Sequence, residues 1–186
     1  MLNLPKLKAC NTKLELIEEI QRVHKELIDY YLQIPAEYYF AKSIPDGWTV
    51  IRNIKHIAST TMLFNFLLKI PKPIKRLFGK PKTSLIDIDK LIVSNRPLMY
   101  DYGKYIKISK YNKSIDKTKY TDLIQISSDK LIKTIETYSD NELDTIKGAL
   151  GAMNTKSVLH FLLKHNIHHT NVTRQRILSG EGNISL

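Results

Sequence analysis

Apolar residues recur every three or four positions along four long stretches of this chain, and this helical period constrains the fold more than any other feature. In the first stretch the residues with this spacing are Leu16, Ile20, Val23, Leu27 and Tyr30. Thr12 and Glu15 precede them with the spacing of a capping box, in which two side chains satisfy backbone N–H groups at the start of a helix. We therefore expect a helix over about residues 12–32 with one buried face.

The same period predicts three further helices, over about residues 49–70, 118–138 and 154–179. Thr49 is suited to the N-cap of the second helix, and Pro71 ends it. No useful run of alternating polar and apolar residues indicates a strand, and no internal repeat is present in the sequence. Four such helices in 186 residues predict an all-α fold, a four-helix bundle that forms one domain over residues 1–186.

The connection between the second and third helices, about residues 71–117, is too long for a bare loop in a compact domain. We expect it to cross the bundle and to carry one short helix around residues 84–93. A simple up-down-up-down order is disfavoured, because bundles with that order use short connections.

The same connection contains the main local cluster of positive charge, which comprises Lys72, Lys75, Arg76, Lys80 and Lys82. The whole chain has 29 Lys and Arg against 18 Asp and Glu, and its formal charge of +11 raises the question of nucleic acid or an anionic membrane. Because the lysines are spread along the chain, we interpret the excess as a solvated surface. We likewise interpret the cluster as a solvated connector stiffened by prolines, in preference to an anion-binding or membrane-surface patch.

Cys10 is the single cysteine, so the chain forms no intramolecular disulfide and gives no reason to invoke an oxidising compartment. The first residues lack the apolar run of a signal peptide, and no stretch approaches the roughly 18 apolar residues of a membrane span. We therefore expect a cytoplasmic protein with no membrane partner.

Histidines gather in the fourth predicted helix. His165 and His169 lie on its apolar stripe, one turn apart, so their imidazoles can reach the same cation. His168 lies nearer the edge of the stripe and is an alternative partner for His165, whereas His160 points away and is predicted to be exposed. A catalytic metal site that leaves a position open usually has three protein ligands, so a further donor is needed.

Two histidines lie outside the fourth helix, and spacing alone does not choose between them. His24 lies near the edge of the buried face of the first helix. His56 shares its face with polar residues, among them Arg52, which suits a solvent-open pocket as well as a plain surface.

The stretch GWTVIRNIKHIAS, in which His56 follows Trp48 by eight residues, resembles the second-helix signature of the DinB/YfiT-like superfamily. The stretch LLKHNIHHTNVTRQRIL is similar to the fourth-helix signature of that family. The resemblance covers most of the chain and implies a divalent metal held by His56, His165 and His169. It also implies up-down-down-up connections with a long crossover between the second and third helices. Many members have Gln where this chain has Val172, so a role of that glutamine is not carried over.

Characterised relatives of this kind use low-molecular-weight thiols such as bacillithiol, mycothiol or glutathione. Three neutral imidazoles leave the full charge of a metal to stabilise a thiolate or to activate water. We therefore predict a metal-dependent enzyme with a small-molecule substrate, and most specifically a thiol S-transferase. Imidazole ligands suit zinc, nickel, copper or iron, of which we expect zinc or nickel. Arg52, Tyr100 and Tyr102 are candidate substrate contacts, and the sequence indicates no general base.

The alternative is a non-catalytic, stress-related or DNA-associated bundle, which the basic excess favours. Against it, no predicted helix has the basic face of a recognition helix, so we do not expect nucleic acid as a partner. Exposed tyrosines on an aromatic-rich bundle also favour a homodimer.

Overall fold

The computed structural model of the protein describes residues 3–44, 47–82, 103–106, 115–148, 150 and 152–181. The long helices of these residues are α1 (Lys13–Gln33), α2 (Val50–Lys69), α4 (Thr118–Ile135) and α6 (Thr155–Glu181). The four expected helices are confirmed, and the capping box of α1 is present, with Thr12 accepting from the backbone of Glu15. The third ends at Ile135, earlier than predicted, because a new capping box at Ser139 starts the short helix α5 (Asp140–Thr145).

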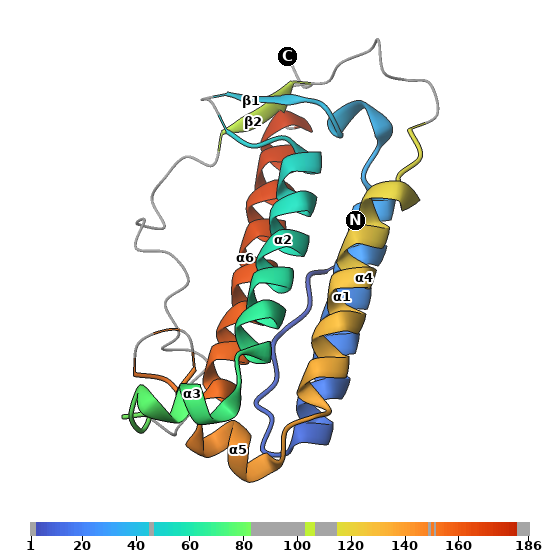
Figure 1. Cartoon of the computed structure of the whole chain (residues 1–186). Helices are drawn as coiled ribbons and strands as arrows, with labels where there is room; N and C mark the ends of the chain where they lie inside the picture. Colours follow the sequence, from blue (N-terminus) through green and yellow to red (C-terminus); the bar gives the residue numbers. More distant parts are fainter. Residues whose placement is uncertain are drawn as a thin grey trace.

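The four long helices form a bundle with up-down-down-up order (Figure 1). α1 and α6 run in one direction, and α2 and α4 run in the other. α4 packs against both α1 and α2, and α6 completes the bundle beside α2 and α1. Because α2 and α4 are parallel, the chain must return along the length of the bundle between them, which explains the long connection.

The core consists of the apolar faces that the helical period predicts. Leu16, Ile20 and Leu27 of α1 are fully buried, and each such side chain contributes roughly 1.5–3 kcal/mol relative to an exposed one. Tyr30 and Tyr31, at the other end of α1, are also fully buried, as are Tyr38, Tyr39, Tyr105 and Tyr138 within a few per cent. The expectation of exposed tyrosines is wrong for Tyr38, Tyr39 and Tyr105, so these residues do not support a homodimer.

A two-stranded antiparallel sheet covers the end of the bundle where α2 begins (Figure 1). β1 (Lys42–Ile44) pairs with β2 (Lys104–Ile106), and Ser43 lies opposite Tyr105. The 3₁₀-helix η1 (Ala36–Tyr38) leads into β1 from α1. The expectation of no strand is wrong here, because strands of three residues are too short for alternation to stand out in the sequence.

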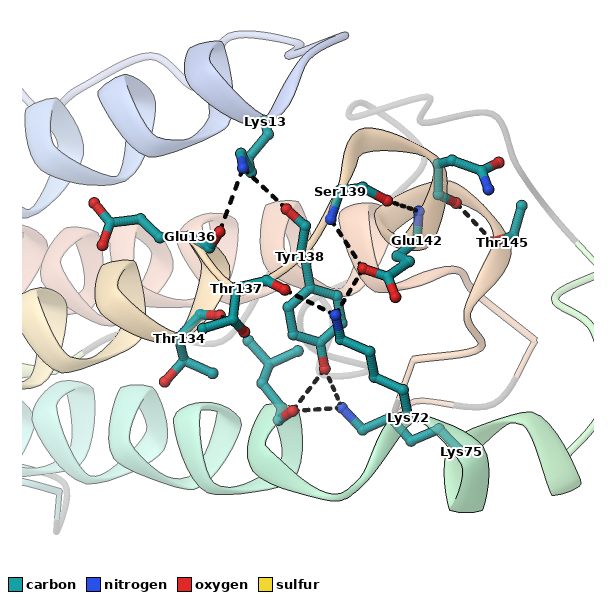
Figure 2. Close-up of polar contacts among 12 residues, drawn as sticks. Lys13, Lys72, Lys75, Thr134, Glu136, Thr137, Tyr138, Ser139, Glu142 and Thr145 are labelled. Carbon is teal, nitrogen blue, oxygen red and sulfur yellow. Dashed lines mark hydrogen bonds and ion pairs between the residues drawn. The ribbon is translucent and has the colours of Figure 1, made fainter.

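The positive cluster lies at the opposite end, on and after the short helix α3 (Lys72–Leu77) (Figure 1). Arg76, Lys80 and Lys82 are exposed, but Lys75 is buried, so the interpretation as a solvated connector is wrong for this residue. Figure 2 shows the Lys75 ammonium beside the hydroxyl of Tyr138. The Lys75 ammonium also donates to the carbonyl of Leu68 at 2.7 Å. A cation there satisfies a carbonyl at the C-terminus of α2.

Burial lowers the pKa of Lys75 to about 8, and the neighbouring Lys72 adds to the shift. Lys72 pairs with Glu142 of α5 at 2.7 Å, so the connector is tied to both α2 and α5. The predicted helix around residues 84–93 lies outside the described residues. Within the described part of the chain, every helix is too short or too polar to cross a bilayer.

Candidate metal centre

His56 of α2 meets His165 and His169 of α6 near the end of the bundle that the sheet covers. The Nε2 atom of His165 lies 3.4 Å from Nε2 of His56 and 3.1 Å from Nε2 of His169. One ring nitrogen from each histidine lies within 4.8 Å of the other two, and no other such trio of His, Cys, Asp or Glu occurs among the described residues. The structure therefore brings together the three histidines that the family resemblance implies.

The fold explains this convergence. α2 and α6 are antiparallel neighbours, and a residue in the second turn of α2 meets the middle of α6 (Figure 1). Thr49 caps α2 by accepting from the backbone N–H of Arg52 at 3.2 Å, which fixes where the first turns begin. On α6 the spacing of four residues places the rings of His165 and His169 4.5 Å apart, centroid to centroid.

All three histidines are half-buried, so they form the wall of a site at the edge of the core. For His165 and His169 this differs from the core positions that the stripe on α6 predicts. Burial lowers the pKa of each of the three imidazoles. The pKa of His169 falls to about 3, first through burial and then through its neighbours His165 and His56. The rings are therefore neutral near pH 7, and their lone pairs are available to a cation.

Trp48 packs directly on this cluster. Its ring is stacked on His169, with centroids 5.4 Å apart and planes at 8°, and it meets the edge of His56 at 4.7 Å. Its carbonyl accepts from the hydroxyl of Tyr105 at 2.8 Å and from the guanidinium of Arg176 at 3.1 Å. Tyr105 of β2 and Arg176 of α6 thus fix the position of Trp48, which packs on His56 and His169. Sequence reasoning missed Tyr105 and Arg176, since neither belongs to a motif with a fixed spacing.

The remaining histidines lie outside the cluster. His168 meets His169 edge to face at 5.6 Å but is not one of the three converging rings, so the geometry favours His169 over His168. The prediction that His160 is exposed is wrong. It is fully buried, and its Nε2 accepts from the backbone N–H of Cys10 at 3.1 Å. The chain before α1 covers this side of α6, which helical periodicity cannot reveal.

His24 is fully buried and is not one of the three converging rings. Of the candidate substrate contacts, Arg52 is exposed and its guanidinium lies 5.0 Å from the centroid of the Trp48 ring. Tyr100 and Tyr102 lie outside the described residues.

A family model described as the DinB superfamily matches residues 19–172, which is well over half of the chain. The match includes Trp48 and all three converging histidines. Comparisons with curated proteins and with solved structures gave no match.

Proposed function

This chain belongs to the DinB superfamily, and on that premise we propose that it is a metal-dependent enzyme whose divalent ion is held by His56, His165 and His169. The observation that carries the proposal is the short distance from Nε2 of His165 to Nε2 of His56 and to Nε2 of His169. Two nitrogens that each lie about 2.0–2.1 Å from a tetrahedral zinc ion are about 3.3–3.4 Å apart. The observed separations of 3.1 and 3.4 Å suit such a set of ligands.

The chemistry of the donors supports the same proposal. Three neutral imidazoles suit zinc, nickel, copper or iron, and we propose zinc or nickel. When bound, the ion would act as a Lewis acid that stabilises a thiolate or lowers the pKa of a water molecule. The histidines and Trp48 supply a half-buried wall that shields this charge from solvent on one side.

Charges near the site favour an anionic substrate. The sequence of α2 contains no Asp or Glu, and that of α6 contains only Glu181, at its last position. Arg52 is exposed beside Trp48, and a guanidinium is a strong partner for a carboxylate, which supports this preference. We therefore propose a thiol S-transferase in which Arg52 orients a low-molecular-weight thiol that carries carboxylates, such as bacillithiol, and the histidines hold the ion.

Metal binding is tested with Trp48, the single tryptophan of the chain. Its ring lies 4.7 to 5.4 Å from two of the three histidines, so Cu²⁺ or Ni²⁺ in the site should quench its fluorescence. We expect saturable quenching at one ion per chain, checked by elemental analysis. His169→Ala should abolish tight binding, whereas His168→Ala, which removes the neighbouring ring, should leave it intact. Equal loss in both variants would exclude His169 as the specific ligand.

Turnover is tested by conjugation of a thiol to a generic electrophile with metal-loaded protein. The proposal expects a histidine-dependent rate that is lost in His165→Ala and retained in His168→Ala. A rate that is the same in wild type and His165→Ala would contradict the enzyme proposal. Weaker binding of the thiol in Arg52→Ala, with kcat retained, would support its role as a substrate contact.

A second candidate function, binding of DNA without catalysis, has one observation in its favour. A surface depression of about 520 Å³ at the α3 end of the bundle is lined by Lys69, Lys72, Lys130 and Lys133. If DNA binds there, its retention should weaken steeply with salt, and Lys130→Glu with Lys133→Glu should abolish it. Retention that these changes do not affect would contradict this candidate.

A further inference from the structure

Each of the four long helices places one buried polar side chain in the same layer of the core, directly behind the candidate metal centre. These residues are His24 of α1, Thr61 of α2, Ser128 of α4 and Asn166 of α6, and none is more than 1% exposed. Buried polar groups destabilise a core unless their hydrogen bonds are satisfied. Their contacts therefore need a full account, and Asn166 is the next residue after His165.

The tautomer of His24 is fixed by its neighbours. Its Nδ1 lies 2.9 Å from the carbonyl oxygen of Ile20, which can only accept, so Nδ1 carries the proton. Ser128 Oγ lies 3.2 Å from the same nitrogen. Burial lowers the pKa of His24 to about 4, so the ring is neutral near pH 7. Its Nε2 is consequently unprotonated and can only accept a hydrogen bond.

The orientation of the Asn166 amide follows. Its Nδ2 lies 3.2 Å from Nε2 of His24 and 3.1 Å from the hydroxyl oxygen of Thr61. The Thr61 hydroxyl donates its own hydrogen to the carbonyl of Ile57 at 2.9 Å, so its oxygen is an acceptor. Because Nε2 of His24 and the hydroxyl oxygen of Thr61 are both acceptors, the group of Asn166 that faces them must be the NH₂ donor. The amide oxygen must then face the other way, where it lies 3.5 Å from Nδ1 of His165.

An amide oxygen can only accept, so this contact places a proton on Nδ1 of His165 and leaves its Nε2 as a lone pair. That Nε2 is the atom that faces both His56 and His169. We propose that Asn166, oriented by His24 and Thr61, is a positioning residue that holds His165 in the tautomer able to bind a metal. We call this chain of contacts, from His24 and Thr61 through Asn166 to His165, the relay. Its role in metal binding rests on the proposed function, whereas the tautomer of His165 does not depend on that function.

Asn65 provides a matched control. It is also a buried asparagine, and its amide oxygen accepts from the hydroxyl of Thr134 at 2.6 Å, between α2 and α4. Nothing in the described contacts of Asn65 involves the three converging histidines. Asn65→Leu therefore also removes a hydrogen bond of a buried asparagine, but leaves the contacts among His24, Thr61, Asn166 and His165 in place.

The direct test is nitrogen-15 NMR of the histidine rings in metal-free protein at mildly alkaline pH, with the His165 signals assigned through His165→Gln. We expect the proton of His165 on Nδ1 in wild type and in Asn65→Leu, and loss of that preference in Asn166→Leu. A proton on Nε2 of His165 in wild type would overturn the proposal, and this outcome does not depend on whether any variant folds.

The second measurement is metal affinity, from quenching of Trp48 fluorescence by Cu²⁺. Loss of a group that orients a metal-binding histidine weakens binding by about 10–100-fold, so we expect at least about tenfold in Asn166→Leu. We expect wild-type affinity in Asn65→Leu, although both variants should unfold at lower urea concentration. Equal affinities in the two variants would overturn the relay. If wild type binds no metal, the proposed function fails, and the NMR result still decides the tautomer.

Discussion

At the scale of single residues, the histidines of this chain differ by what surrounds them more than by where they fall in the helical period. His56 and His24 occupy comparable boundary positions in the sequence pattern, yet one is half-buried in the cluster and the other is fully buried. Periodicity identifies a face of a helix, but it does not say which other helix covers that face. The family resemblance supplied His56, and no pattern indicated the layer around Asn166.

The first prediction concerns the pH dependence of stability that His24 imposes. Its pKa is lowered from an ordinary 6.5 to about 4 in the folded protein. Above pH 6.5 both states are neutral, and as pH falls towards 4 only the unfolded state gains a proton, so stability is lost over this window. At 1.36 kcal/mol per pKa unit the loss from this residue is about 3 kcal/mol.

Urea unfolding at a series of pH values from about 7 to 4 measures this effect. His24→Gln keeps hydrogen-bonding capacity without an ionisable ring, so its stability should fall less steeply with decreasing pH than that of wild type. An unchanged slope in this variant would show that other groups cause the acid sensitivity.

At the scale of elements, the loop before α2 carries Trp48, whose ring contacts two of the three converging histidines. Gly47 lies against Arg176, and a Cβ at Gly47 would come within 2.4 Å of a guanidinium nitrogen. Arg176 in turn donates to the carbonyl of Trp48. The helices were predictable because their apolar faces repeat over many residues, whereas β1 and β2 have three residues each and contact one another across a long stretch of sequence.

The second prediction is that Gly47→Ala displaces Arg176, loosens Trp48 and weakens metal binding. Gly79→Ala is the control, since a Cβ at Gly79 meets nothing within 4 Å and only its φ of +83° is unfavourable. Replacing a glycine of positive φ costs roughly 1 kcal/mol of stability. We expect both variants to be destabilised, but only Gly47→Ala to change the Trp48 emission spectrum and the Cu²⁺ affinity. An altered affinity in Gly79→Ala alone would contradict this account of the loop.

At the scale of the whole molecule, the sequence predicts the bundle and its long crossover, and the structure confirms both. His160 is buried because residues before α1 pack on α6, and buried Lys75 lies against Tyr138, which follows α4. Both errors concern contacts between segments far apart in the chain. Such contacts depend on tertiary packing, which a local period does not encode. The expectation of a single domain over residues 1–186 stays a prediction.

The third prediction is that metal binding stabilises the whole fold, because the proposed ligands come from both α2 and α6. At a free metal concentration about 100 times the Kd, the stabilisation is about 2.7 kcal/mol, which raises Tm by about 5–10 °C for a chain of this size. Thermal unfolding of wild type and His165→Ala, with and without Zn²⁺, measures the shift. The same rise in both proteins would show that the ion binds elsewhere.

The most direct test of the central claim is an anomalous-difference map from crystals of the metal-loaded protein, recorded at the absorption edge of the bound metal. The account predicts one peak about 2.0–2.1 Å from the Nε2 atoms of His56, His165 and His169. A map with no peak between these three rings, or with its peak at His168 or another surface histidine, would contradict the claim that they hold one ion.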